Sequence, residues 1–278
     1  MNSKCFHYFL SPAGRAGGAD AVIPLPFPGE GGPVYPGNAR PVEPVIPLPF
    51  PGEGGPVYPG CPNGNCGSSR VRFLNAAYNY PAFRISVDNN RFVNRLNYAS
   101  VSGYGRVRSG YQVVTVTGVN GRVYLQKSMP FHVNGLTTIA IVKTSSGLDL
   151  LQIPDNCCPP SNGYSSFRVG NLAYNSGPLD VLMSDGRVVY GDLRYKEVAS
   201  FRRIAPGNYQ FFYADTNLTP MPPALDIEPL DPSWLGVYPP YNTFGSLILN
   251  ATGREVFSVY LIQNGPGRNN IQNLILVD

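Results

Sequence analysis

The stretch Arg72-Phe73-Leu74-Asn75-Ala76-Ala77-Tyr78-Asn79 recurs later in the chain as Arg168-Val169-Gly170-Asn171-Leu172-Ala173-Tyr174-Asn175. Further correspondences follow in the same order: Leu96-Asn97-Tyr98 with Leu193-Arg194-Tyr195, Tyr104 with Phe201, Ser109–Val113 with Pro206–Phe211, Ile139–Val142 with Phe257–Tyr260, and Leu148–Asp155 with Ile271–Asp278. An ordered series of matches of this kind indicates one structural unit present twice. We therefore expect two copies of one domain, copy 1 at residues 70–156 and copy 2 at residues 157–278.

Each copy is built from short apolar or alternating runs that turn signals separate. In copy 1 the runs are Val71–Ala76, Phe83–Val87, Gln112–Thr117, Val123–Gln126, Thr137–Val142 and Leu148–Ile153, and the turn signals are Asp88-Asn89-Asn90, Val119-Asn120-Gly121 and Ser145-Ser146-Gly147. About seven short strands in each copy, without a helical period between them, are typical of an antiparallel sandwich. The sequence predicts an all-β protein with two tandem immunoglobulin-like antiparallel β-sandwiches.

Residues 1–69 differ in composition from the rest of the chain and form a Pro/Gly-rich N-terminal arm. The 16-residue segment Val22–Gly37 recurs letter for letter at Val45–Gly60. Prolines at this density remove backbone donors and fix φ, which favours an extended polyproline II strap, with a disordered tail as the alternative. Apolar side chains at equivalent places of the two segments are expected to dock on a neighbouring subunit. These are Ile23, Phe27 and Tyr35 in the first segment, and Ile46, Phe50 and Tyr58 in the second.

Copy 2 carries an insertion at residues 218–242 that copy 1 lacks. The insertion contains seven prolines and the single tryptophan of the chain, Trp234. It is expected to be a loop that packs on the domain or binds a ligand. Trp234, Tyr238 and Tyr241 are its candidate ligand residues.

The five cysteines, Cys5, Cys61, Cys66, Cys157 and Cys158, all lie outside the expected strands. Their spacing fits disulfides better than a structural zinc site, which favours fewer intervening residues. The Cα atoms of adjacent residues lie about 3.8 Å apart, below the usual disulfide window of about 4.4–6.8 Å. Cys157 and Cys158 are therefore expected to bond to different partners, with free thiols as the alternative.

Charge is low overall and unevenly distributed. Charged residues make up 14% of the chain, and its formal charge of +4 divides into −1 for residues 1–69, +7 for copy 1 and −2 for copy 2. Eight arginines supply most of the charge of copy 1: Arg70, Arg72, Arg84, Arg91, Arg95, Arg106, Arg108 and Arg122. They suit an anionic glycan, an acidic neighbour or nucleic acid, or they are scattered along strand edges. Because no nucleic-acid-binding motif accompanies them, we predict no nucleic-acid partner.

Catalytic patterns are weak. The chain has two histidines, His7 and His132, and nothing in the sequence places them together. No nucleophile elbow, metalloprotease motif or phosphate-binding loop is present, and Gly103-Tyr104-Gly105 reads as a turn. We predict that the protein is not an enzyme and that it uses neither a cofactor nor a metal.

Four short motifs resemble a bacterial family of tandem immunoglobulin-like domains of unknown function that occurs largely in cell-envelope proteins. The residues that carry the resemblance are Arg70-Val71-Arg72-Phe73-Leu74-Asn75-Ala76, Pro81-Ala82-Phe83, Leu179-Asp180-Val181 and Ala205-Pro206-Gly207-Asn208-Tyr209. The first copy departs from the family at Arg84, where the family has an aspartate. The resemblance implies the sandwich fold and an envelope location, and it implies no chemistry.

The functional hypothesis combines these features. No segment has the length of a transmembrane helix, and residues 1–12 do not resemble a secretory signal. An envelope-type fold with oxidisable cysteines but no visible export signal fits a spore coat or spore appendage, whose subunits are made inside a mother cell. We predict a self-assembling structural protein of the spore or cell surface. Its expected partners are other copies of itself, other coat or envelope proteins or an anionic glycan; the alternative is an adhesion or glycan-binding module that uses aromatic loops.

Overall fold

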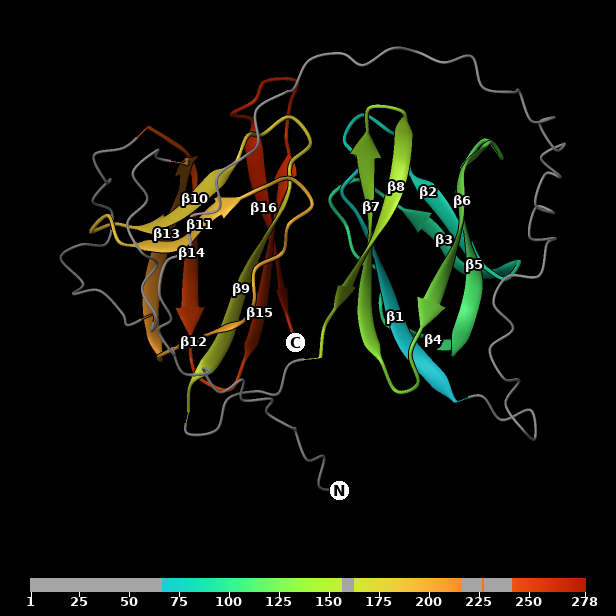
Figure 1. The fold of residues 1–278 in the computed structure, drawn as a ribbon, viewed down its shortest axis with the longest axis horizontal. Helices are drawn as coiled ribbons and strands as arrows, with labels where there is room; N and C mark the ends of the chain where they lie inside the picture. Colours follow the sequence, from blue (N-terminus) through green and yellow to red (C-terminus); the bar gives the residue numbers. More distant parts are fainter. Residues whose placement is uncertain (1–66, 157–162, 217–226, 228–241) are drawn as a thin grey trace, which may run out of the picture. The chain divides into compact units, whose positions relative to one another are not determined.

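The computed structural model describes residues 67–156, 163–216, 227 and 242–278. These residues form sixteen β-strands (Figure 1). Residues Pro59–Asp278 belong to one compact unit. The expected all-β architecture is confirmed, whereas the N-terminal arm lies outside the described residues.

Copy 1 contains eight strands in two four-stranded sheets. The strands are β1 (Ser68–Asn75), β2 (Phe83–Val87), β3 (Asn90–Leu96), β4 (Gly105–Arg108), β5 (Gly110–Gly118), β6 (Val123–Phe131), β7 (Leu136–Thr144) and β8 (Gly147–Pro154). One sheet has the order β4-β1-β7-β8 and the other the order β3-β2-β5-β6. Fifteen buried side chains, including Phe73, Phe83 and Ile139, fill the space between the two sheets.

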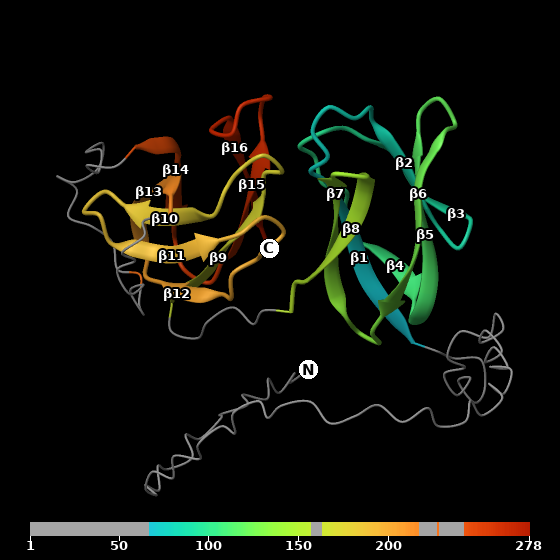
Figure 2. The same cartoon turned by 45° about the horizontal axis from the view of Figure 1, so that its top comes forward.

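Copy 2 repeats this arrangement (Figure 2). Its strands are β9 (Ser165–Leu172), β10 (Leu179–Met183), β11 (Val188–Leu193), β12 (Arg202–Ile204), β13 (Gly207–Asp215), β14 (Thr243–Ala251), β15 (Val256–Gln263) and β16 (Ile271–Val277). The sheets have the orders β12-β9-β15-β16 and β11-β10-β13-β14. The duplicated sequence therefore gives two sandwiches with the same strand order.

Two strands of copy 1 were not among the expected runs. Strand β3 (NRFVNRL) and strand β4 (GRVR) are edge strands with mostly exposed or half-buried side chains. An edge strand faces solvent along much of its length, so its sequence carries little apolar alternation. The predicted turn at Gly103-Tyr104-Gly105 is correct only as far as Tyr104, because Gly105 begins β4.

Each sandwich contains one parallel strand pair within otherwise antiparallel sheets. Strand β1 pairs in parallel with β7, and β9 pairs in parallel with β15. The two registers place Phe73 beside Ile139 and Val169 beside Val259. The expected match of Ile139–Val142 with Phe257–Tyr260 is thus wrong by two residues. The true counterpart of Ile139–Val142 begins at Val259.

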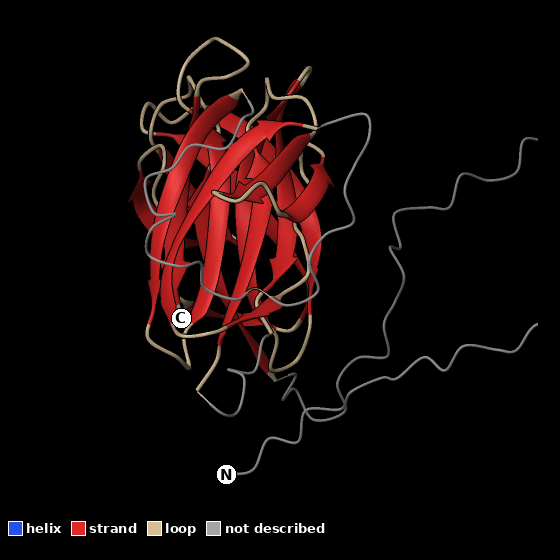
Figure 3. Ribbon diagram, turned by 90° about the vertical axis from the view of Figure 1, so that its left-hand side faces the viewer, coloured by secondary structure: helices blue, strands red, loops and turns tan. Residues whose placement is uncertain are grey.

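Strands β7, β9 and β15 are buried on both faces, unlike β5, which alternates between buried and half-exposed residues. One face of each strand lies in the core of its own sandwich. The other face belongs to a separate apolar cluster that joins residues of both copies. This double burial explains why β7 and β15 contain near-continuous apolar runs. Figure 3 shows the described elements as strands and loops; no helix long and apolar enough to cross a membrane occurs among them.

We predict that residues 67–278 fold without the arm, because each copy has its own apolar core among the described residues. Circular dichroism of the truncated protein should show β-structure and one cooperative melting transition close to that of the full chain. A truncated protein that is unfolded at room temperature would show instead that the arm completes a sandwich.

Candidate functional site: the junction between the sandwiches

The sheet β4-β1-β7-β8 of copy 1 contacts the sheet β12-β9-β15-β16 of copy 2. The apolar part of this junction includes Leu74 and Ala140 from copy 1, and Leu172 and Tyr260 from copy 2. All four side chains are fully buried. The junction is therefore a third apolar core of the molecule, shared by both copies.

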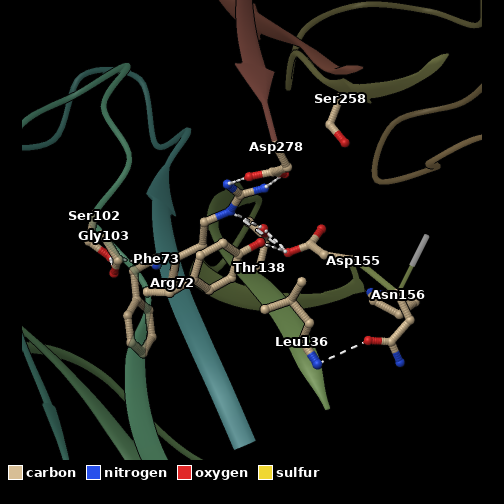
Figure 4. Close-up of polar contacts among 12 residues, drawn as sticks. Arg72, Phe73, Ser102, Gly103, Leu136, Thr138, Asp155, Asn156, Ser258 and Asp278 are labelled. Carbon is tan, nitrogen blue, oxygen red and sulfur yellow. Dashed lines mark hydrogen bonds and ion pairs between the residues drawn. The ribbon is translucent and has the colours of Figure 1, made fainter. Parts of the chain in front are cut away.

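Arg72 points from β1 into this junction. Its Nη1 and Nη2 atoms donate to the two carboxylate oxygens of Asp278, both at 2.7 Å, and its Nε donates to Thr138 Oγ1 at 2.8 Å (Figure 4). The guanidinium lies 4.4 Å from the centre of the Tyr104 ring. The paired, forked geometry is the strongest arrangement between an arginine and a carboxylate. Arg72 thereby ties copy 1 to the last residue of copy 2.

Arg168, the counterpart of Arg72, makes the reciprocal connection. Its Nη2 donates to Asp155 Oδ1 of copy 1 at 2.5 Å, and its Nε donates to Ser258 Oγ at 2.9 Å. Its guanidinium lies 4.3 Å from the centre of the Phe201 ring. Each arginine thus pairs with an aspartate that follows the last strand of the other copy. We call these residues and their partners the junction network.

Asp155 is the most buried carboxylate of the junction network, with 2% of its side chain exposed. Besides Arg168, it accepts hydrogen bonds from Thr138 Oγ1 at 2.5 Å and from the Tyr104 hydroxyl at 2.8 Å. Burial and the negative charge of Asp155 raise the pKa of Tyr104 above its ordinary value. Tyr104 therefore stays protonated and remains a hydrogen-bond donor over the whole physiological pH range.

Arg72 also keeps its positive charge. Burial acts to lower the pKa of Arg72, but the hydrogen bonds to Asp278 and the nearby charge of Asp155 raise it above its ordinary value. The paired hydrogen bonds between Arg72 and Asp278 thus hold one sandwich in a fixed position on the other.

Two tyrosine hydroxyls cross the junction at equivalent places. Tyr98 of copy 1 donates to the backbone carbonyl of Gln263, and Tyr195 of copy 2 donates to the backbone carbonyl of Lys143 at 2.5 Å. Tyr98 corresponds to Tyr195, and the strand registers make Lys143 the counterpart of Gln263. Both the ionic and the neutral contacts of the junction are therefore reciprocal, as in a two-fold symmetric dimer.

Several aromatic residues near the strand ends of the described domains have partners within the chain. Tyr78 contacts Tyr98 edge to face at 5.7 Å, and Tyr174 contacts Tyr195 in the same way at 5.6 Å. Tyr80 packs on Phe83 and Tyr124, and Arg203 lies over the ring of Tyr164 at 4.2 Å. These side chains stabilise the fold and the junction. Because they already have contacts within the chain, they give little support to the hypothesis of aromatic ligand-binding loops.

The reciprocity is incomplete at Asp149. Its carboxylate accepts from Lys127 Nζ of its own copy at 2.7 Å and from Lys196 Nζ of copy 2 at 2.9 Å. Partial burial acts to raise the pKa of Asp149, but the bonds from the two lysines lower it to about 2. Gln272 occupies the equivalent place in copy 2, so only one side of the junction carries this ion pair.

A depression of about 460 Å³ lies beside the junction, lined by residues of both copies. Gln152 and Asn156 of copy 1 and Arg168, Lys196 and Phe201 of copy 2 are among its lining residues. Arg168 already uses its Nε, Nη1 and Nη2 atoms to bind Ser258, the Pro154 carbonyl and Asp155. The depression offers amide groups and one ammonium group, and no nucleophile paired with a base lies among its lining residues.

The residues singled out in the sequence lie mostly outside the described part of the chain. These are the five cysteines Cys5, Cys61, Cys66, Cys157 and Cys158, the arm residues Ile23, Phe27, Tyr35, Ile46, Phe50 and Tyr58, and the insertion residues Trp234, Tyr238 and Tyr241. His132 is exposed directly after β6. Within the described ranges, no group of three or more His, Cys, Asp or Glu side chains is arranged to hold a metal ion.

The junction network itself was not predicted, although the sequence contained two signals for it. Arg72 and Arg168 stand at the same place in the duplicated stretch, and both matched C-terminal segments end in an aspartate, Asp155 and Asp278. Both correspondences are visible in the repeat. The sequence does not connect them, because the contact runs from the first strand of one copy to the residue after the last strand of the other.

Residues 69–182 match the family profile of a domain of unknown function, DUF4397. The match covers less than half of the chain and extends from β1 to β10. It includes Arg72, Asp155 and Arg168 and excludes Asp278. The DUF4397 description assigns no activity, and no curated protein sequence matches the chain.

We predict that Arg72→Ala lowers the free energy of unfolding by about 3–5 kcal/mol, because it leaves Asp278 without its guanidinium partner and removes the hydrogen bond that Thr138 Oγ1 accepts. Urea denaturation of the full chain measures this. The control is Arg194→Ala, whose ion pair with Asp192 is exposed and should contribute almost nothing. In a double-mutant cycle, Arg72→Ala and Asp278→Ala should be strongly non-additive; additive effects would contradict a direct coupling.

We also predict that alkaline pH weakens the junction. Burial raises the pKa of Tyr98 to about 12 and raises that of Tyr195 in the same direction. An unfolded tyrosine has a pKa of about 10, so the stability from these hydroxyls is present below about pH 10 and is lost as pH rises through about 12. The melting temperature of the wild type should therefore fall more steeply between pH 9 and 11 than that of Tyr98→Phe/Tyr195→Phe. Parallel pH profiles would show that other groups cause the loss.

Proposed function

We propose that the chain is a structural, self-assembling subunit of a bacterial spore or cell surface, such as a spore coat or an appendage. In this proposal the arm of one subunit docks on the next, and disulfides cross-link subunits. The supporting observation is the reciprocal junction network, which commits three of the four buried charged residues in the described part of the chain, Arg72, Asp155 and Arg168, to fixing one sandwich on the other. A pair of domains joined in this way is suited to serve as a single building block.

Exposed apolar side chains on edge strands of copy 2 support self-association. Ile248 on β14 is 72% exposed and Val277 on β16 is 59% exposed. Both strands are at the edge of their sheets. The two edges lie next to each other, because Asn273 Nδ2 of β16 donates to the Ser246 carbonyl of β14 at 3.0 Å. Unpaired strand edges with apolar side chains are templates for pairing with another chain.

The alternative function, surface adhesion or glycan binding through aromatic loops, has less support. It requires aromatic side chains that are available to a ligand. Tyr78, Tyr80, Tyr164 and Tyr174 instead contact other residues of the chain. Other coat or envelope proteins remain proposed partners beside further copies of the chain itself.

The proposal predicts that the arm controls assembly. Deletion of residues 1–60, or the double substitution Phe27→Ser/Phe50→Ser, should reduce particle size in light scattering and remove filaments or sheets from electron micrographs. The reason is the loss of the two equivalent apolar segments that dock on a neighbour. A Val119→Ser variant, which changes an exposed apolar residue of a copy 1 turn, is the matched control. Assembly of the deleted protein at the level of the full chain would contradict the proposal.

A further inference from the structure

A second depression, of about 360 Å³, lies on copy 1 beside the edge strand β4. Three arginines line it, Arg91, Arg106 and Arg108, together with the amide side chains of Asn90 and Gln112. Its volume falls in the range of about 300–1,000 Å³ that is usual for small-molecule sites. We call it the arginine-lined depression.

The described part of the chain offsets the positive charge of this depression only in part, with one carboxylate in the lining against three guanidinium groups. None of its three arginines has an ion-pair partner among the described residues. The carboxylate in the lining, that of Asp88, accepts a hydrogen bond from the backbone N–H of Val113 at 2.7 Å. Arg70 stands directly opposite Arg106 in the β1–β4 ladder. Like charges placed opposite each other destabilise a sheet, so a bound anion would stabilise this edge.

The corresponding place in copy 2 carries fewer unpaired positive charges than the arginine-lined depression of copy 1. The strand registers make Val188 the counterpart of Arg91, and Ala205 the counterpart of Arg108. Neither of these residues carries a charge. Two of the three arginines are therefore replaced by apolar residues in copy 2, and only Arg106 has a cationic counterpart, Arg203.

The same edge is also covered in copy 2. Ile227 forms a parallel bridge with Ile204, the counterpart of Val107, and its side chain is buried in the core of copy 2. Tyr209, the counterpart of Gln112, donates its hydroxyl to the Ala205 carbonyl at 2.7 Å and is fully buried. Copy 1 lacks both features among its described residues, and the arginine-lined depression remains at that place.

We propose that the arginine-lined depression of copy 1 binds a phosphate group. Arginine side chains match the geometry of phosphate oxygens and pair with them through two donors at once. Several guanidinium groups around one depression suit the oxygens of one doubly charged phosphate, or of neighbouring singly charged phosphodiesters, better than a single carboxylate. The phosphate belongs either to a small free compound or to a surface polymer with repeated phosphodiester groups. This site is independent of the assembly proposed above.

The test uses isothermal titration of the full chain with inorganic pyrophosphate and, separately, with poly(glycerol phosphate). Arg91→Gln/Arg106→Gln/Arg108→Gln should weaken binding at least tenfold. The matched control, Arg187→Gln/Arg203→Gln/Arg254→Gln, removes the same charge from copy 2 and should bind like the wild type. The single variant Arg108→Ala introduces the residue that copy 2 carries at this place; it should weaken binding without affecting folding, which circular dichroism checks.

Selective loss in the copy 1 variants supports the site. Binding of pyrophosphate identifies a free phosphate compound as sufficient, whereas binding of poly(glycerol phosphate) alone identifies the polymer as the ligand. Equal losses in the copy 1 and copy 2 triple variants would overturn the proposal, because net charge would then account for binding. Absence of binding of either probe to the wild type would overturn it as well.

Discussion

Two guanidinium groups in the middle of the molecule, those of Arg72 and Arg168, constrain the rest of the structure. Each lies on the first strand of its sandwich, on the face turned away from its own core. A guanidinium does not lose its proton under ordinary conditions, and its transfer out of water costs several kcal/mol unless a carboxylate and further acceptors surround it. The carboxylates come from the other copy, as Asp278 and Asp155. Each sandwich therefore supplies the charge that the other needs.

The apolar part of the junction does not define one arrangement by itself. The contacts of Leu74, Ala140, Leu172 and Tyr260 are apolar and have no preferred direction, so they do not by themselves fix the register of one sheet on the other. The forked bond between Arg72 and Asp278 requires two donors and two acceptors to be aligned at once. We interpret the junction network as the element that sets the register, a role that buried polar groups have in other assemblies.

The sequence predicted those parts of the fold that repeat and that are buried. The strands β1, β2, β5 and β7 were expected because their apolar runs are bounded by Asn, Gly and Asp turns, and Asp88 and Asn89 indeed adopt positive φ angles of 47° and 64°. Edge strands β3 and β4 were missed because solvent exposure removes the apolar pattern. The junction network was missed for a different reason: pairing between copies depends on three-dimensional packing. An arginine in a strand does not reveal whether it points to solvent or to a neighbouring domain.

The two copies differ at the sheet edge that β4 forms in copy 1 and β12 forms in copy 2. The short strands β4 and β12 occupy the same place, and each needs protection, because a free edge invites pairing with other chains. In copy 2 the backbone of Ile227 pairs with β12 and covers that edge. In copy 1 the edge strand instead carries Arg106 and Arg108, and charge is the other common means of preventing edge pairing.

The two ways of protecting the edge have different consequences. A covered edge is closed to ligands, whereas an edge protected by arginines repels other cationic strands and attracts anions. The divergence thus leaves copy 2 with a completed sheet edge and gives copy 1 the concentration of positive charge that a phosphate group can occupy.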